Sequence, residues 1–106
     1  MNESIQVVIT GIRNHLAAIY GERLRNVYLF GSFARNEAVE ESDIDLLIVL
    51  DTVENYIQEV ERTSAIISQL SLACGRSITC VFASEDQWKN SETMFFQNVR
   101  EEAIPA

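Results

Sequence analysis

Proline and cysteine are scarce in this 106-residue sequence, which contains one of the former and two of the latter. Because Pro105 stands one residue from the end, no proline interrupts a helix or strand in the body of the chain. Cys74 and Cys80 are too few for a disulfide scaffold, and they lack the spacing of a metal site. We interpret both as ordinary buried thiols of a cytoplasmic protein.

Basic residues are also few, since 8 Lys and Arg stand against 16 Asp and Glu and give a net charge of −8. Nucleic-acid phosphates require a basic face, so we expect no direct binding of DNA or RNA. An anionic membrane surface is disfavoured for the same reason. No apolar run approaches the ~20 residues that span a bilayer. The N-terminal residues MNESIQVV show no secretion signal, and we expect no membrane contact.

The chain is 47% hydrophobic, which is enough for a single domain over residues 1–106 with one core. Helical and strand patterns alternate, which predicts an α+β or α/β layered fold with a small sheet of about three core strands and helices packed on it. About a dozen residues separate the first two strands, so their relative direction stays open. The predicted elements are a helix over 4–20 that stops at Gly21, a strand over 26–30, a short helix over 32–36, a strand over 43–50, a long helix ending near Cys74 and Gly75, a strand over 77–82, a short helix after Ser84, and a helix over 92–103.

The long helix has two candidate N-caps, Asp51 and Thr52. Ser84 and Gln87 predict a capping box for the short helix that holds Trp88. Arg76 and Lys89 are interpreted as ordinary surface charges. The apolar face of the long helix is expected to include Val53, Tyr56, Ile57, Val60, Ile67 and Leu70.

Candidate site residues begin where the first predicted strand ends, at Gly31 and Ser32. Glycine lets a backbone approach a phosphate closely, and the N–H groups at a helix N-terminus point towards it. Arg35 lies one helical turn further on, where its guanidinium can pair with a phosphate oxygen. A Gly-Ser pair at a strand end, taken alone, fits a simple tight turn equally well.

Two aspartates, Asp43 and Asp45, favour a phosphate-binding turn over a simple tight turn. Residues i and i+2 of a strand point to the same face, so the two carboxylates are expected to stand side by side. Like charges this close repel, and a divalent cation is the natural compensation. The alternative is a solvated strand end that happens to be acidic. The Gly-Ser pair upstream favours the cation site.

The motifs GSFAR and SDIDLLIVL, with ten residues between the Gly-Ser pair and D-x-D, resemble the minimal nucleotidyltransferases of the DNA polymerase beta superfamily. The resemblance covers most of the chain. It implies a nucleotidyltransferase fold with a mixed sheet and helices on one side of it. It also implies transfer of a nucleoside monophosphate from ATP or another NTP, with Mg²⁺ that Mn²⁺ can replace. In that family Gly31, Ser32 and Arg35 would hold the triphosphate, and Asp43 and Asp45 would be the catalytic residues that bind the metal.

Two positions depart from the family pattern. A third carboxylate is expected on the next strand, most naturally at Thr79, but no acid lies between Glu61 and Glu85. A hydroxyl cannot replace an anionic bridge or a base. Asn36 stands where the family usually has glycine. Because asparagine tolerates the left-handed conformation, the turn is expected to survive.

The resemblance further implies a helical HEPN-type partner, with this chain acting as the antitoxin of a toxin–antitoxin pair that modifies the partner protein. A homo-oligomer is a second possibility. The short chain leaves no room for an acceptor-binding domain, which also favours a partner. The missing carboxylate keeps an alternative open: a catalytically degenerate domain that binds nucleotide or a partner without transfer.

Overall fold

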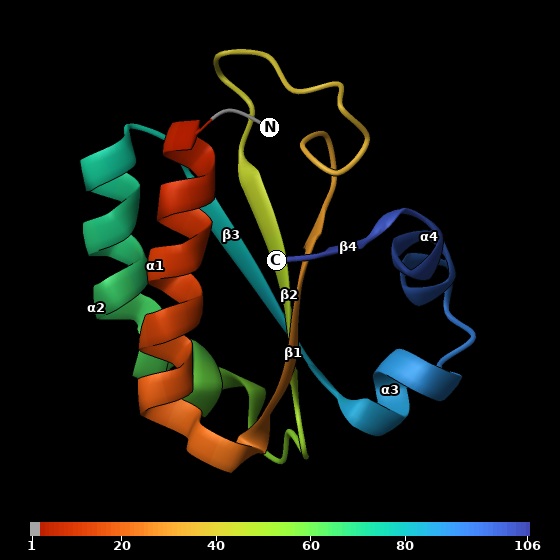
Figure 1. Ribbon diagram of the computed structural model, residues 1–106. Helices are drawn as coiled ribbons and strands as arrows, with labels where there is room; N and C mark the ends of the chain where they lie inside the picture. Colours follow the sequence, from red (N-terminus) through yellow and green to blue (C-terminus); the bar gives the residue numbers. More distant parts are fainter. Residues whose placement is uncertain (1–2) are drawn as a thin grey trace.

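The computed structural model describes residues 3–106, arranged as a mixed sheet between two pairs of helices (Figure 1). In chain order the elements are α1 (Glu3–Tyr20), the short 3-10 helix η1 (Gly21–Arg23), β1 (Leu24–Phe30), β2 (Ile44–Leu50), α2 (Tyr56–Cys74), β3 (Ile78–Ser84), α3 (Glu85–Asn90), α4 (Met94–Glu102) and β4 (Ile104–Pro105).

The sheet has the strand order β3-β2-β1-β4. Strands β1 and β2 are antiparallel, whereas β2 and β3 are parallel, so the sheet is mixed as predicted. The short strand β4 was not predicted. It is two residues long, and Ile104 and Pro105 pair with Leu29 and Tyr28 of β1. A pair this short leaves no alternating pattern in the sequence.

Helices cover both faces of the sheet, so the expectation of helices on one side is wrong. Helices α1 and α2 lie on one face, and α3 and α4 lie on the other (Figure 1). The second face is covered because Val99 of α4 and Trp88 of α3 pack against Leu47 and Val49 of β2. Apolar side chains therefore project from both faces of β2.

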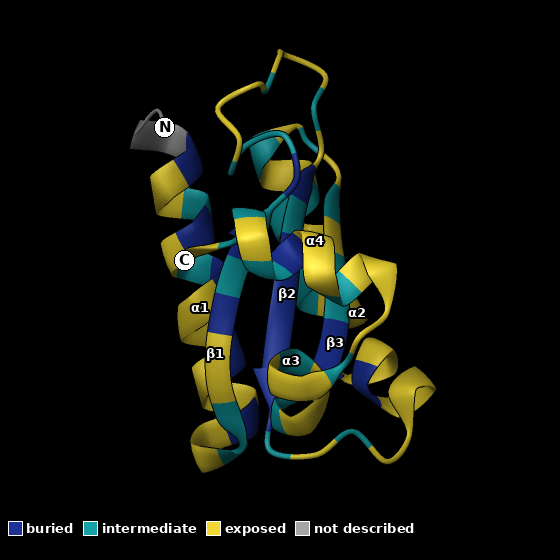
Figure 2. Cartoon of the chain, turned by 90° about the vertical axis from the view of Figure 1, so that its right-hand side faces the viewer, coloured by how far each residue is buried: buried dark blue, intermediate teal, exposed yellow. Residues whose placement is uncertain are grey.

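Strand β2 is the centre of the molecule and is dark blue over most of its length in Figure 2. All five residues from Leu46 to Leu50 are fully buried. Leu46, Ile48 and Leu50 belong to the core beneath α1 and α2. Leu47 and Val49 belong to the core beneath α3 and α4. The two sets project from opposite faces of the strand, as its period of two requires.

Helix α2 begins later than predicted. Its N-cap is Asn55, whose side chain accepts a hydrogen bond from the backbone N–H of Gln58. Asp51 instead accepts hydrogen bonds from the Thr52 backbone N–H and from the Arg23 side chain, so neither predicted cap is the cap. The predicted end is confirmed, since Gly75 is left-handed with φ 71°.

The apolar face predicted for α2 is confirmed at only half of its positions. Tyr56, Ile57 and Val60 are exposed, whereas Val53, which precedes the helix, Ile67 and Leu70 pack against the core. The buried positions on this helix are Glu59 and Thr63. A buried carboxylate needs polar partners, and the neighbouring elements supply them.

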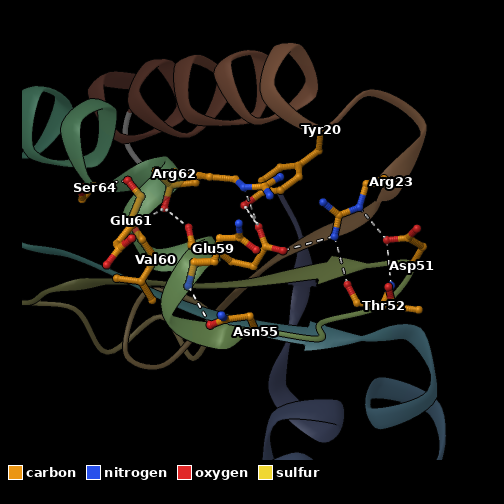
Figure 3. Close-up of polar contacts among 12 residues, drawn as sticks. Tyr20, Arg23, Asp51, Thr52, Asn55, Glu59, Val60, Glu61, Arg62 and Ser64 are labelled. Carbon is orange, nitrogen blue, oxygen red and sulfur yellow. Dashed lines mark hydrogen bonds and ion pairs between the residues drawn. The ribbon is translucent and has the colours of Figure 1, made fainter.

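Glu59 is the centre of a polar network at the lower end of the sheet (Figure 3). Its carboxylate accepts a 2.9 Å hydrogen bond from the Tyr20 hydroxyl and a 3.2 Å bond from Arg23. Arg62 lies 3.7 Å from the same carboxylate, and Arg23 also bonds Asp51 at 3.0 Å. Burial foremost, and the Glu59 hydrogen bond next, raise the pKa of the Tyr20 hydroxyl. The network ties the end of α1, η1 and the loop after β2 to α2.

Helix α3 begins where the sequence indicates, whereas α4 begins two residues later than predicted, at Met94. Ser84 and Gln87 form the predicted capping box at the start of α3. Trp88 stacks on Tyr28 of β1 with 4.5 Å between ring centroids. Thr93 caps α4. Within residues 3–106, every helix is too short or too polar to cross a membrane.

Candidate active site

Residues 31–36, between β1 and the loop that leads to β2, form consecutive turns. The Arg35 N–H bonds the Gly31 carbonyl at 3.1 Å, and the Glu37 N–H bonds the Ser32 carbonyl at 2.8 Å. Gly31 (φ 74°) and Asn36 (φ 59°) are both left-handed, so the segment between them cannot extend into a helix. The predicted helix over 32–36 is wrong, whereas the left-handed Asn36 is confirmed.

Gly31 lies against the carboxylate of Asp45. The two strands place Phe30 opposite Asp45 in the antiparallel register, so Gly31 follows directly beside it. A Cβ atom built on Gly31 would collide with Oδ2 of Asp45. Glycine is therefore required twice here, for its positive φ and for this close approach. The Gly-Ser turn and the second aspartate form one structural unit.

Burial and repulsion both act on Asp45, which is partly buried, while Asp43 is exposed at the entrance to β2. Burial foremost, and the Asp43 carboxylate next, raise the pKa of the Asp45 carboxyl. Arg35 opposes this shift, and Glu102 adds to it. Four charged side chains from three segments thus act on one another at this end of the sheet, and three of the four are negative.

Arg35 is already paired within the chain. Its Nε atom lies 3.1 Å from Glu37, and its Nη1 atom lies 2.8 Å from Glu102 on α4. These two carboxylates raise the pKa of the guanidinium, Glu102 more strongly. Sequence reasoning did not find Glu102, because 67 positions separate it from Arg35 and only the folded α4 brings it here.

A cleft of about 400 Å³ opens beside these residues, between the turn and α4. It contains four of the five predicted site residues, Gly31, Ser32, Arg35 and Asp45. Asp43 acts on it through its charge on Asp45. The cleft is lined by Phe30, Gly31, Ser32, Arg35 and Asp45 on one side and by Phe95, Asn98, Val99 and Glu102 of α4 on the other.

Thr79 stands where a third acid was expected. It pairs with Asp45 in the parallel register between β2 and β3, and it is exposed. Within the described part of the chain, no three His, Cys, Asp or Glu side chains converge closely enough to hold a metal ion. At this end of the sheet β2 and the residue before it therefore supply two aspartates, and β3 has no acid at position 79.

Comparison with known protein families gives one clear match, because residues 14–101 fit the family described as polymerase beta, nucleotidyltransferase. A protein of Methanocaldococcus jannaschii, MJ0604, is provisionally named a protein adenylyltransferase. It is 36% identical over 103 residues, which cover 96% of this chain and 95% of that protein. The protein adenylyltransferase MntA of Thermococcus cleftensis is 30% identical over 59 residues, which cover 56% of this chain and 58% of MntA.

Solved structures share the fold. A structure provisionally described as a minimal nucleotidyltransferase has a TM-score of 0.65 at 24% identity, over 98% of this chain and 94% of that one. The crystal structure of a toxin–antitoxin with AMP-PNP has a TM-score of 0.61 at 21% identity, over 90% of this chain and 69% of that one. At these identities the likeness concerns the fold alone.

Proposed function

Because this chain belongs to the polymerase beta nucleotidyltransferase family, we propose that it transfers AMP from ATP to a hydroxyl group of a partner protein. The observation that carries the proposal is the contact between the Gly31 turn and the Asp45 carboxylate, with Asp43 beside it and an open cleft in front. A glycine turn beside paired acids is suited to bind a polyphosphate together with its counter-ion.

Three residues of the turn are proposed to bind the triphosphate. Gly31 lets the chain approach closely, and the Ser32 hydroxyl can donate a hydrogen bond to a phosphate oxygen. Arg35 supplies the only positive charge among the residues that line the cleft in the described chain. Since Arg35 is held by Glu37 and Glu102, a phosphate must compete with these carboxylates for its guanidinium.

The donor set fits Mg²⁺, which Mn²⁺ can replace. The two aspartates offer oxygen ligands. Their negative charges repel each other when no cation is bound. Arg35 is already paired with two other acids. Mg²⁺ is commonly held by one or two carboxylates together with substrate phosphates. Asp43 and Asp45 would hold it, and it would neutralise charge on the phosphates.

A toxin is the partner that the relatives suggest, with this chain as its antitoxin. Two of them are named protein adenylyltransferases, and a structural neighbour is a toxin–antitoxin complex. We propose a helical HEPN-type toxin as the acceptor. The cleft is open to solvent, so a hydroxyl carried on another protein can reach it. A second copy of this chain is the other possible contact.

Thr79 favours a second candidate, a domain that binds nucleotide without transferring it. The Thr79 hydroxyl beside Asp45 cannot accept the proton of an attacking hydroxyl as a carboxylate would. In that case Asp43 and Asp45 retain a binding role only. The two candidates share the site and differ in whether a product forms.

The test is incubation of the chain with ATP labelled at the α-phosphate, Mg²⁺ or Mn²⁺, and the protein encoded by the neighbouring gene. Transfer predicts a labelled partner that disappears with Asp43→Asn and with Asp45→Asn. Nucleotide binding by calorimetry without label on the partner would support the degenerate domain. Absence of metal-dependent nucleotide binding would overturn both candidates.

A further inference from the structure

Arg76 connects three segments around the candidate site, although its place in the sequence suggests only a surface charge. It lies in the turn between α2 and β3, directly after Gly75. We propose that Arg76 is a positioning residue: it clamps residues 39–42 of the loop that leads into Asp43 and thereby fixes the Asp43 carboxylate for cation-dependent nucleotide binding.

The backbone of Arg76 is itself held firmly. Gly75 ends α2 in the left-handed conformation, with its N–H bonded to the Ser71 carbonyl. The Ser71 hydroxyl then donates a 2.6 Å hydrogen bond to the Arg76 carbonyl. The side chain therefore starts from a backbone that the end of α2 holds in place.

The guanidinium of Arg76 bonds the loop through backbone carbonyls. Its Nη1 atom lies 3.2 Å from the carbonyl of Val39, 2.7 Å from that of Glu40 and 3.0 Å from that of Ser42. A hydrogen bond from a charged donor is stronger than a neutral one, and three acceptors meet at this single nitrogen. Because Asp43 directly follows Ser42, the clamp ends one residue before the aspartate.

The same guanidinium also contacts the phosphate-binding turn. Its carbon atom lies 5.2 Å from the centre of the Phe33 ring, within the range of a cation–π contact. Phe33 follows Ser32 directly. Arg76 thus joins the two halves of the candidate site, the turn at 31–36 and the entrance to β2.

Charge explains why the loop needs a clamp. Glu37, Glu40, Glu41 and Asp43 are all exposed acids within seven residues. Their mutual repulsion favours an extended, open loop. Arg76 opposes this by binding the backbone carbonyls rather than the carboxylates, so it fixes the backbone without neutralising the acids.

The inference rests on the proposed function, and its test separates the two. The variants are Arg76→Ala, Arg76→Lys and the control Lys89→Ala, which removes the same charge from the exposed end of α3. Two quantities are measured: amide hydrogen exchange of residues 37–43 without ligand, and the affinity for Mn²⁺ with AMP-PNP by calorimetry. Exchange of β2 amides reports whether each variant is folded.

We expect Arg76→Ala to accelerate exchange in the loop, to leave β2 protected, and to weaken the affinity by about tenfold. Arg76→Lys should lie between, because an ammonium lacks the planar fork and stacks less well. Lys89→Ala should match the wild type. If Arg76→Ala does not fold, Phe33→Leu removes the ring contact while keeping an apolar side chain against the core, and it should give a smaller effect of the same kind.

Unchanged loop exchange in Arg76→Ala would overturn the inference, whatever the protein binds. Faster exchange with the affinity of Lys89→Ala would also overturn it, because the clamp would then be structural only. A wild-type chain that does not bind Mn²⁺ with AMP-PNP would overturn the proposed function, and the role of Arg76 with it.

Discussion

Asp45 shows a conflict between stability and binding within one side chain. It is partly buried against Gly31, and Asp43 repels it. Since folding raises the pKa of this carboxyl, the folded state binds the proton more tightly than the unfolded state does. Stability then falls as the pH rises through the titration range of the carboxyl. Ionised Asp45 therefore opposes folding at neutral pH.

Asp45→Asn is expected to raise the Tm at pH 7 by about 2–4 °C, because the amide carries no charge to desolvate. The difference from the wild type should shrink as the pH falls and vanish near about pH 3, where the carboxyl is protonated in both states. Thermal unfolding followed by circular dichroism between these pH values checks this. Glu41→Gln, in the exposed loop, is the control, and a lower Tm for Asp45→Asn at pH 7 would contradict the account.

Glu102 is expected to compete with nucleotide for Arg35. Glu102→Gln removes the carboxylate that lies 2.8 Å from the guanidinium, so Arg35 becomes available to a phosphate. The affinity for AMP-PNP with Mn²⁺, measured by calorimetry, should rise by about threefold to tenfold. Glu101→Gln changes the neighbouring exposed acid and should leave the affinity unchanged. Weaker binding by Glu102→Gln would mean that this carboxylate assists the ligand.

Helix α2 depends on one buried carboxylate where an apolar side chain is usual. Glu59 joins Tyr20, Arg23 and Arg62, so its removal leaves two guanidinium groups without their shared partner. We expect Glu59→Gln to lower the free energy of unfolding by about 1–3 kcal/mol. Urea denaturation measures this. Glu61→Gln, exposed on the same helix, should change stability little, and equal effects would argue against the network.

The start of α2 provides a test of which residue caps it. Asn55→Ala removes the side-chain acceptor for the Gln58 N–H and should cost about 1 kcal/mol. Thr52→Ala should stay within about 0.5 kcal/mol, because the structure places Thr52 outside the helix. Urea denaturation of both variants decides between the positions. A larger loss for Thr52→Ala would restore the cap that the sequence suggested.

The elements that the sequence predicts well are those whose signal is local. The two faces of β2, the glycine end of α2 and the Ser84 capping box each depend on spacing within a few residues. Helix α2 misleads because its inward side carries Glu59, whose partners come from elsewhere in the chain. Apolar positions at 56, 57 and 60 fit a helical pattern but remain exposed.

The candidate site also has parts that the sequence predicts and parts that only the fold reveals. The Gly-Ser turn and the D-x-D pair are local motifs, and the antiparallel β1 and β2 bring them together. Glu102 and Arg76 reach the same region from α4 and from the end of α2, and no spacing rule connects them to residues 31–45. Only the folded chain reveals these contributions.

Both edges of the sheet are protected. On β3, the Phe82 N–H donates to the Tyr56 hydroxyl, and the Ser84 N–H donates to the Gln87 side chain. On β4, Pro105 has no N–H to offer. These features reduce the capacity of either edge to pair with another strand. Tyr56 is exposed and does not belong to the core, but its hydroxyl helps to protect the edge of β3.

The whole molecule carries a net charge of −8, so it repels nucleic acids. We expect no binding of duplex DNA or of RNA at about 150 mM salt, with any Kd weaker than about 10 µM. Fluorescence anisotropy with labelled oligonucleotides measures this. Binding that weakens steeply with added salt would reveal a basic surface that the charge balance does not suggest.

The burial of β2 over most of its length has a consequence for the energetics of recognition. Its amides should be among the slowest in the protein to exchange with solvent, and Asp45 is part of this strand. Because Asp45 lies on this rigid strand, it loses little conformational freedom when a ligand binds. The entropic cost of ordering that wall of the cleft is already met during folding, so the main cost left on binding is the restricted motion of the ligand itself.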